Sequence, residues 1–261
     1  VDPAAVARVG PDTAVTPDAG KTSASRQTFV SGNAARLAGE ALRARILRHA
    51  NASPDAALVF GAGRLGVREG GEAVREIDLA ALSPDADGYV FHAVESWDPP
   101  TSPLDANGQG DPYATFGYAA HLVELAVDVE LGTVRPLAIA AAHDVGRAIN
   151  PVLVEGQVEG GIAQGLGMAL MEDYVPGRTE NLHDYLIPTI GDVPPVDTTI
   201  VEAADPHGPY GAKGLGEHAL IPTAPAVLNA IRDATGARIR RLPATPDRVR
   251  AAILVARGGA A

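Results

Sequence analysis

The most regular pattern of apolar positions lies between residues 150 and 170. Apolar side chains recur there every fourth residue, as on one face of an α-helix, at Val154, Val158, Ile162, Leu166 and Leu170. Asn150 is a good N-cap, and Pro151 suits the first helical position because its missing N–H costs nothing there. The pattern predicts a helix that begins at Pro151 and buries this apolar stripe.

Five glycines lie inside the same predicted helix, at positions 156, 160, 161, 165 and 167. Each costs roughly 0.5–1 kcal/mol of helix stability relative to alanine, so a further interaction must offset the loss. Close approach of a neighbouring backbone is one explanation, and a flat ligand is the other. Gln157, Gly161 and Gln164 share one side of the helix. The two amides could hydrogen-bond a flat heterocycle, whereas the small residues alone favour helix–helix contact.

Alternating apolar and polar residues predict a β-hairpin over residues 121–130 and 134–142, which ends at residues 144–146. Shorter extended pieces are predicted at residues 57–60, 89–92 and 185–188, and a long surface loop at residues 99–112. These segments supply the strands of the fold.

Two more helices are expected, one on each side of this central region. The first covers residues 31–49 with Ser31 as its N-cap, and the second covers residues 223–235 with Gly236 as its C-cap. No internal repeat or low-complexity linker divides the chain. We therefore expect the α+β class, with mixed sheets and packed helices over residues 1–261.

Composition narrows the classes of function that remain. The chain has 261 residues and a formal net charge of −11, which argues against nucleic-acid binding and favours solubility. It has no cysteine, so it supplies no disulfide, zinc thiolate or iron–sulfur site of its own. No apolar run approaches the ~20 residues of a membrane span. A start without Met or a signal-peptide pattern suggests an internal fragment or cleavage product in the cytoplasm.

Two loops could bind a ligand. Residues 22–28 are rich in hydroxyl and amide groups and precede a predicted helix, where free N–H groups favour phosphate or pyrophosphate, although a simple capping loop would look the same. Residues 208–217 place glycines around Lys213 and Glu217, which allows close approach to a ligand. An apolar pocket would raise the proton affinity of Glu217, as a general base requires; the alternative is a solvated charge.

His143 and Asp144, at the end of the predicted hairpin, could suggest a metal site or a catalytic triad. No serine nucleophile is suitably placed, and the other histidines lack metal-motif spacing. We interpret both residues as structural.

Three blocks of the chain together resemble the C-terminal half of the molybdenum-binding subunit in the xanthine dehydrogenase/aldehyde oxidase family. They are residues 22–28 with 31–34, residues 144–161 with 164–167, and residues 208–217. Residues 242–246 also resemble the usual ending of that subunit. The second and third blocks are the most specific, and the resemblance covers nearly the whole chain.

The resemblance implies a C-terminal molybdopterin-binding region whose metal is held by the pterin dithiolene, with no direct protein ligand. Glu217 would be the general base, and the metal would lie near Glu217 and the backbone of Ala24. The cofactor and its phosphates would be wrapped by Ala24, Ser25, Arg26, Gln27 and Thr28. Gln157 would bind the pterin, and Lys213 would make a nearby contact. The Ser-Arg-Gln form is more similar to the bacterial type that uses molybdopterin cytosine dinucleotide.

The resemblance also implies partners. The N-terminal part of the large subunit is absent from these residues, and iron–sulfur clusters and FAD would lie on partner chains. The expected activity is hydroxylation of a purine, another N-heterocycle or an aldehyde, with a xanthine dehydrogenase-like reaction favoured. The alternatives are a non-catalytic scaffold that keeps the fold and a nucleotide-binding module without metal chemistry.

Overall fold

The structure is a computed structural model that describes residues 6–10, 12–61 and 63–258. The chain divides into two compact units. The first holds the described residues up to Lys21 together with Val30–Pro100, and the second holds Thr22–Phe29 and the chain from Thr101 onward. Each unit contains helix and sheet, so the α+β class predicted from the sequence is confirmed. This division was not predicted, because no linker or shift in composition marks it along the chain.

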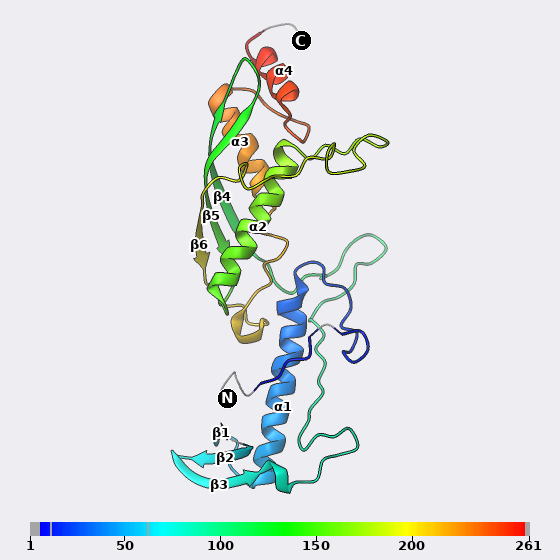
Figure 1. The fold of residues 1–261 in the computed structure, drawn as a ribbon, viewed down its shortest axis with the longest axis vertical. Coiled ribbons are helices and arrows are strands. Elements are labelled where there is room, and N and C mark those ends of the chain that lie inside the picture. The colour runs from blue at the N-terminus through cyan, green and yellow to red at the C-terminus, as the bar shows by residue number, and fades with distance from the viewer. Residues whose placement is uncertain (1–5, 11, 62, 259–261) are drawn as a thin grey trace. The chain divides into compact units, whose positions relative to one another are not determined.

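The first unit packs one long helix on a small antiparallel sheet. The helix is α1 (Gly32–Ala50), and the strands are β1 (Ala57–Gly61), β2 (Arg64–Glu69) and β3 (Glu72–Asp78), with β2 in the centre (Figure 1). Its core is apolar and includes Ile46, Leu47, Leu65, Val67 and Ile77. The guanidinium of Arg43 donates to the carbonyls of Pro54 and Ala56, at 2.6 and 2.8 Å, and so ties the helix to the connection that follows it.

The start of α1 corrects the sequence prediction. Ser31 was expected to be the N-cap, but a π-helical turn, Gln27–Ser31, precedes the α-helix. Ser31 has helical dihedral angles, with φ −67° and ψ −33°, and not the extended backbone of a capping residue. The helix itself lies where the apolar spacing placed it.

The second unit contains a three-stranded mixed sheet in the order β4-β5-β6. Strands β4 (Ala119–Val127) and β5 (Val134–Asp144) form the predicted hairpin, with a bulge beside Glu124 and Leu125. Strand β6 (Val196–Val201) lies parallel to β5 and was not predicted. A strand that pairs in parallel is connected to its partner by a long segment. The short turn that identifies a hairpin in a sequence is therefore missing.

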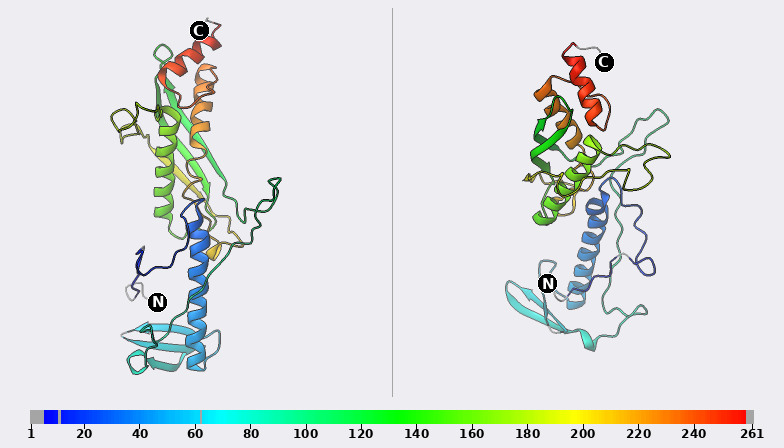
Figure 2. Two further views of the ribbon diagram at one scale, coloured as in Figure 1. Left: turned by 90° about the vertical axis from the view of Figure 1, so that its right-hand side faces the viewer. Right: turned by 45° about the horizontal axis from the view of Figure 1, so that its top comes forward.

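Helices α2 (Pro151–Leu170) and α3 (Thr223–Thr235) pack on this sheet and against each other (Figures 1 and 2). The side chain of Asn150 accepts a hydrogen bond from the N–H of Leu153 at 3.2 Å, which confirms the predicted cap of α2. Gly236 ends α3 in a left-handed conformation, as expected. A further helix, α4 (Pro246–Ala256), was not predicted. The shared core includes Ile139, Val158, Ile162, Leu166, Val227, Ile231 and Ile253.

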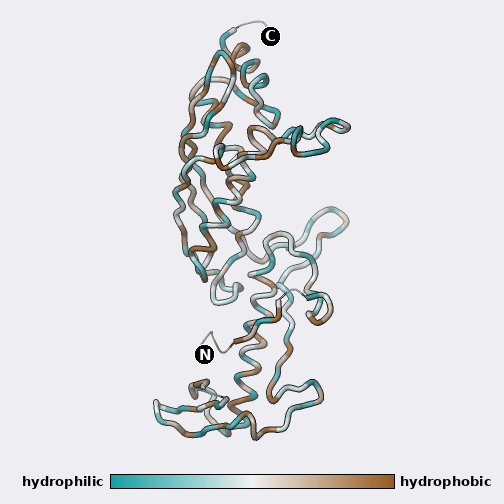
Figure 3. Tube along the Cα trace, viewed as in Figure 1, coloured by the Kyte–Doolittle hydropathy of each residue, from teal (hydrophilic) through white to brown (hydrophobic). Residues whose placement is uncertain are grey.

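The connections are long and irregular. Residues 99–112 form the loop that the prolines and glycines predicted, whereas residues 89–92 form no strand, contrary to the prediction. The loop between α2 and β6 has a hydrophilic tip (Figure 3) and contains no regular strand at residues 185–188. Among the described residues, no helix combines the length and the apolar character that crossing a membrane requires.

Candidate functional site

The serine-rich loop is held in an unusual backbone conformation. Ala24 and Ser25 both adopt left-handed angles, with φ of 54° and 53°. This conformation costs an L-residue roughly 1–2 kcal/mol, so surrounding contacts must maintain it. One such contact is the hydroxyl of Ser25, which accepts a hydrogen bond of 2.7 Å from the backbone N–H of Glu217. Two residues 192 positions apart in the sequence are therefore joined directly.

Gly214 allows the same loop to approach the glycine-rich segment. A Cβ at this position would lie 2.0 Å from the carbonyl oxygen of Ser25, far inside van der Waals contact. The glycine is therefore required by the close approach of two backbones. The sequence predicted that these glycines allow close approach to a ligand; at Gly214 the group that approaches closely is the backbone of the serine-rich loop.

The glycine-rich segment is also tied to the end of β5. The N–H of Lys213 donates to the carbonyl of Val145 at 2.9 Å, and the N–H of Arg147 donates to the carbonyl of Gly211 at 2.8 Å. Tyr210 has a left-handed φ of 54° within this turn. These bonds fix the backbone on the N-terminal side of Glu217.

Lys213 and Asp144 form a buried ion pair. The ammonium nitrogen lies 2.6 Å from Asp144 Oδ2, and the side chains are only 10% and 8% exposed. Lys213 also donates to the carbonyl of Phe116 at 2.9 Å. Burial by itself raises the pKa of Asp144, but the bonds from Lys213 and the N–H of Gly146 outweigh it and hold that pKa below its usual value. The pair supports the structural interpretation of Asp144 and engages Lys213 within the chain.

Helix α2 brings Gln157 to the same segment. The side-chain oxygen Oε1 of Gln157 lies 3.4 Å from the place that a Cβ on Gly216 would occupy. Gly161 faces inward instead, where a Cβ would lie 2.7 Å from Cβ of Ala219, and Gly165 faces Thr223 at 2.5 Å. Packing by the chain itself therefore explains Gly161 and Gly165, while the amide of Gln157 stays exposed.

This distinction gives a first prediction. We expect Gly161→Ala to lower the free energy of unfolding by roughly 1–3 kcal/mol, because the new methyl group overlaps the backbone of Ala219. Gly160→Ala is the matched control, since nothing lies within 4 Å of its Cβ position, and it should raise stability by roughly 0.5–1 kcal/mol. Denaturant titration of both variants checks this, and equal effects would contradict the packing assignment.

Glu217 itself is exposed in this chain. The apolar pocket expected around its carboxylate is not formed by the described residues of this chain, and its backbone N–H is the group held by Ser25. Gln27 and Thr28 are also exposed at the start of the π-helical turn, and the side chain of Arg26 is half-buried. The structure thus brings together Ser25, Gln157 and the segment containing Lys213 and Glu217.

Sequence reasoning missed a cluster of three imidazoles beside Glu217. Nε2 of His121 on β4 lies 2.8 Å from Nε2 of His143 on β5, and the ring of His218 lies 5.4 Å from that of His143. Burial, followed by the charges of His121 and His218, lowers the pKa of His143 to about 4. The hairpin register contained the only local signal, because Ala119 pairs with His143 and places His121 two positions away on the same face.

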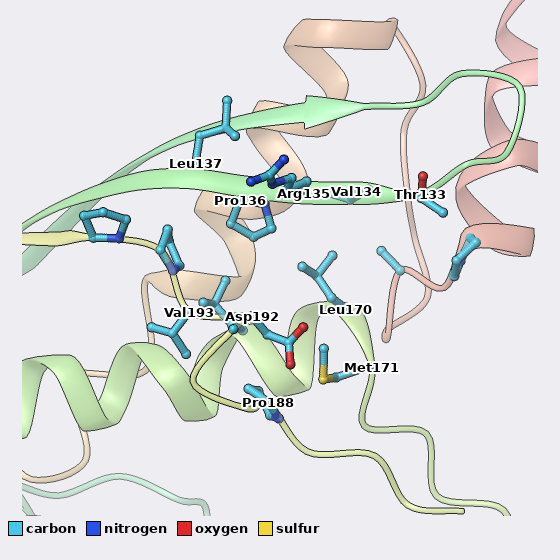
Figure 4. A pocket seen from close by; sticks show the side chains of 16 residues that line it. Thr133, Val134, Arg135, Pro136, Leu137, Leu170, Met171, Pro188, Asp192 and Val193 are labelled. Carbon is cyan, nitrogen blue, oxygen red and sulfur yellow. The ribbon is translucent and has the colours of Figure 1, made fainter.

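A pocket of about 500 Å³ lies elsewhere in the second unit, between β5, the end of α2 and residues 188–195 (Figure 4). Apolar side chains and prolines line most of it, and Arg135 and Asp192 are its charged members. None of the site residues predicted from the sequence lines this pocket. It is therefore separate from the site built around Glu217.

This chain is similar to a known family of cofactor-binding domains and to subunits of known oxidoreductases. The family model for the molybdopterin cofactor-binding domain matches residues 1–194. The putative xanthine dehydrogenase molybdenum-binding subunit of Escherichia coli K12 is 35% identical over 91% of this chain and 32% of its own length. Aldehyde oxidoreductase of Megalodesulfovibrio gigas is 31% identical over 92% of this chain and 24% of its own.

Solved structures agree with these relatives. The crystal structure of aldehyde oxidoreductase from Desulfovibrio desulfuricans matches with a TM-score of 0.73 and 32% identity, over 91% of this chain and 24% of that one. The chain thus spans about a third or less of the length of the relatives that it matches.

Proposed function

Because the chain belongs to the molybdopterin cofactor-binding domain family, we propose that it forms the cofactor-holding part of a molybdenum hydroxylase. One observation carries the proposal. Three sequence blocks that are far apart in the chain meet at Gly214 and Glu217, where Ser25 contacts both residues and Gln157 lies beside the glycine between them. A scaffold without chemistry would not need this convergence around an exposed carboxylate.

The residues present fit a flat pterin with a phosphate-bearing tail. The exposed amide of Gln157 has both a donor and an acceptor for the edge of a pterin ring. The left-handed turn at Ala24 and Ser25 is followed by Arg26, whose permanent positive charge suits a phosphate.

In the proposed mechanism, each element of this site has one task. When bound, the cofactor supplies a metal centre that adds a water-derived oxygen to an electron-poor carbon and accepts two electrons. Gln157 orients the pterin, and residues Ala24, Ser25, Arg26, Gln27 and Thr28 hold the cofactor near its metal and phosphates, Ala24 through its backbone. Glu217 accepts a proton as the substrate is oxidised, and Ser25 holds the backbone from which that carboxylate projects. Lys213 acts on the site through its bond to Asp144.

The form of the cofactor and the partner chains are also part of the proposed function. The sequence Ser25-Arg26-Gln27 supports molybdopterin cytosine dinucleotide as the cofactor form. Electrons must leave the metal, and a chain without cysteine offers no iron–sulfur cluster of its own. We therefore place iron–sulfur clusters and FAD on partner chains. The remaining part of a large subunit would enclose Glu217, which is exposed here.

The substrate we propose is a small electron-poor molecule: a purine first, or another N-heterocycle or an aldehyde. The names of the relatives support this range, since one is called a xanthine dehydrogenase subunit and another an aldehyde oxidoreductase. A scaffold or a metal-free nucleotide-binding module remains the alternative to be tested.

Metal and nucleotide analysis of the protein purified with its natural partners tests the proposal. We expect close to one molybdenum per chain, release of a cytosine nucleotide on acid hydrolysis, and oxidation of at least one compound from a panel of purines, N-heterocycles and aldehydes. An active preparation without molybdenum would overturn the proposal. A folded preparation with bound nucleotide but without metal or oxidation would favour the nucleotide-binding module.

The contact between Gly214 and Ser25 gives a second prediction. We expect Gly214→Ala to lower the molybdenum content of the assembled protein severalfold, because a Cβ 2.0 Å from the Ser25 carbonyl forces the two cofactor-binding segments apart. Gly191→Ala is the control, since its nearest neighbour would be Thr189 Oγ1 at 3.7 Å. Unchanged molybdenum in the Gly214 variant would show that this close approach is not needed for cofactor binding.

A further inference from the structure

Three histidines from separate parts of the second unit meet next to Glu217. His121 comes from β4, His143 from β5, and His218 is the residue that follows Glu217. The ring of His143 is fully buried and lies 5.0 Å from that of His121 and 5.4 Å from that of His218, measured between ring centroids. The cluster thus connects the sheet to the segment that presents the proposed general base.

His218 fits tightly on its other side as well. A Cβ added to Gly117 would lie 2.8 Å from Cε1 of His218 and 3.0 Å from its Nδ1. The imidazole is therefore confined between the backbone at Gly117 and the ring of His143. Because His218 points inward while Glu217 is exposed, the position of this ring determines the backbone from which the carboxylate projects.

The hydrogen bonds of the cluster have a direction that can be inferred. Nδ1 of His143 has no partner among the described residues, and a buried nitrogen without a proton is less costly than an orphaned N–H. His143 therefore carries its proton on Nε2 and donates to Nε2 of His121. His121 must then carry its proton on Nδ1, which lies 3.2 Å from Oγ1 of the buried Thr223 at the start of α3. This assignment uses one proton on each ring, so both rings are neutral.

We propose that His218 is a positioning residue for Glu217, held in place by the neutral His121–His143 pair and by Gly117. The inference rests on the proposed function, since it assumes that Glu217 is the general base. It goes further by assigning a task to three histidines to which the proposed function gives no role. Both neighbours of Glu217 in the sequence are then held, Gly216 beside Gln157 and His218 in the cluster.

Acid should disturb the cluster. Burial lowers the pKa of all three histidines; for His218, Lys213 acts in the same direction while Asp144 opposes it. In the unfolded chain these imidazoles take up protons below about pH 6.5, whereas His143 stays neutral in the folded protein down to about pH 4. The stability that depends on neutral rings is thus complete above pH 6.5 and is lost progressively as the pH falls toward 4.

Variants of the assembled holoenzyme test the proposal with two readouts, turnover and backbone hydrogen exchange in residues 214–222. We expect His218→Ala to keep its molybdenum, to lower kcat by roughly 10- to 100-fold with little change in KM, and to speed exchange in this segment. His218→Phe should restore most of both losses, because a planar ring fills the same space. Gly117→Ala should act like His218→Ala, because it displaces the ring without removing it. Gly39→Ala, with nothing within 4 Å, is the control.

The outcomes separate this inference from the proposed function. If His218→Ala speeds exchange but leaves kcat unchanged, the histidine is merely structural and the positioning role is wrong. If His218→Ala changes neither readout, or if the Phe variant restores nothing, the proposal is likewise overturned. If instead Glu217→Gln retains full turnover while the His218 variants lose theirs, Glu217 is not the general base, and positioning of that base is excluded with it.

Discussion

Replacing Glu217 with glutamine should lower turnover by at least ~10²-fold while the molybdenum content stays unchanged, as expected when a general base is lost. Glutamine keeps the size of the side chain and can still form hydrogen bonds, but it cannot take up a proton. The backbone N–H that bonds to Ser25 is unaffected by the change. Steady-state kinetics together with metal analysis of the same preparation measure both quantities.

Glu202→Gln is a suitable control for this experiment. That carboxylate is also exposed, and it accepts a hydrogen bond from the N–H of Ala148 at 2.8 Å outside the proposed site. We expect the control to keep its turnover. Full turnover in the Glu217 variant would remove this residue from the mechanism, whereas loss of molybdenum in that variant would instead assign it to cofactor binding.

Replacing Lys213 with methionine should lower the free energy of unfolding by about 3–5 kcal/mol, the usual cost of leaving one member of a buried ion pair uncompensated. Asp144 would keep its hydrogen bond from Gly146 but would lose the cation 2.6 Å away, in surroundings where its side chain is only 8% exposed. The carbonyl of Phe116 would lose a donor as well. Chemical denaturation of the assembled protein measures the change.

The double variant Lys213→Met with Asp144→Asn separates the ion pair from a cofactor contact. A neutral amide at position 144 needs no cation, so we expect the double variant to recover part of the lost stability. If Lys213→Met removed the cofactor without lowering stability, the lysine would be a cofactor ligand and the structural account of the pair would be wrong.

Local patterns predicted the elements whose causes are local. Helix α2 follows from the cap at Asn150 and the apolar stripe, and the β4–β5 hairpin follows from alternation on both sides of one turn. Strand β6 was not predicted because, among the described strands, it pairs with β5 alone, and that pairing is parallel and follows a long connection. Residues 89–92 have the composition of a strand but no partner strand, so their propensity has no effect.

The candidate site likewise has features that local sequence patterns predict and features that only distant contacts create. From the sequence alone, the glycines around Glu217 indicated a segment that a ligand could approach closely, and the resemblance to a known family selected Ser25 and Gln157. Only the structure could show that Ser25 bonds to Glu217 across 192 positions, because no spacing rule connects such distant residues. The imidazole cluster was not predicted from the sequence for a related reason. His218 meets the histidines of the hairpin only in the tertiary fold, and no sequence motif connects them.

The position of the metal tests the central claim most directly. An anomalous difference map recorded at the molybdenum absorption edge, from crystals of the assembled enzyme, would locate it without assumptions about the reaction. We expect a single strong peak facing the carboxylate of Glu217 and close to the backbone of Ala24. A molybdenum peak elsewhere in the assembly, with Glu217 still exposed to solvent, would contradict the account.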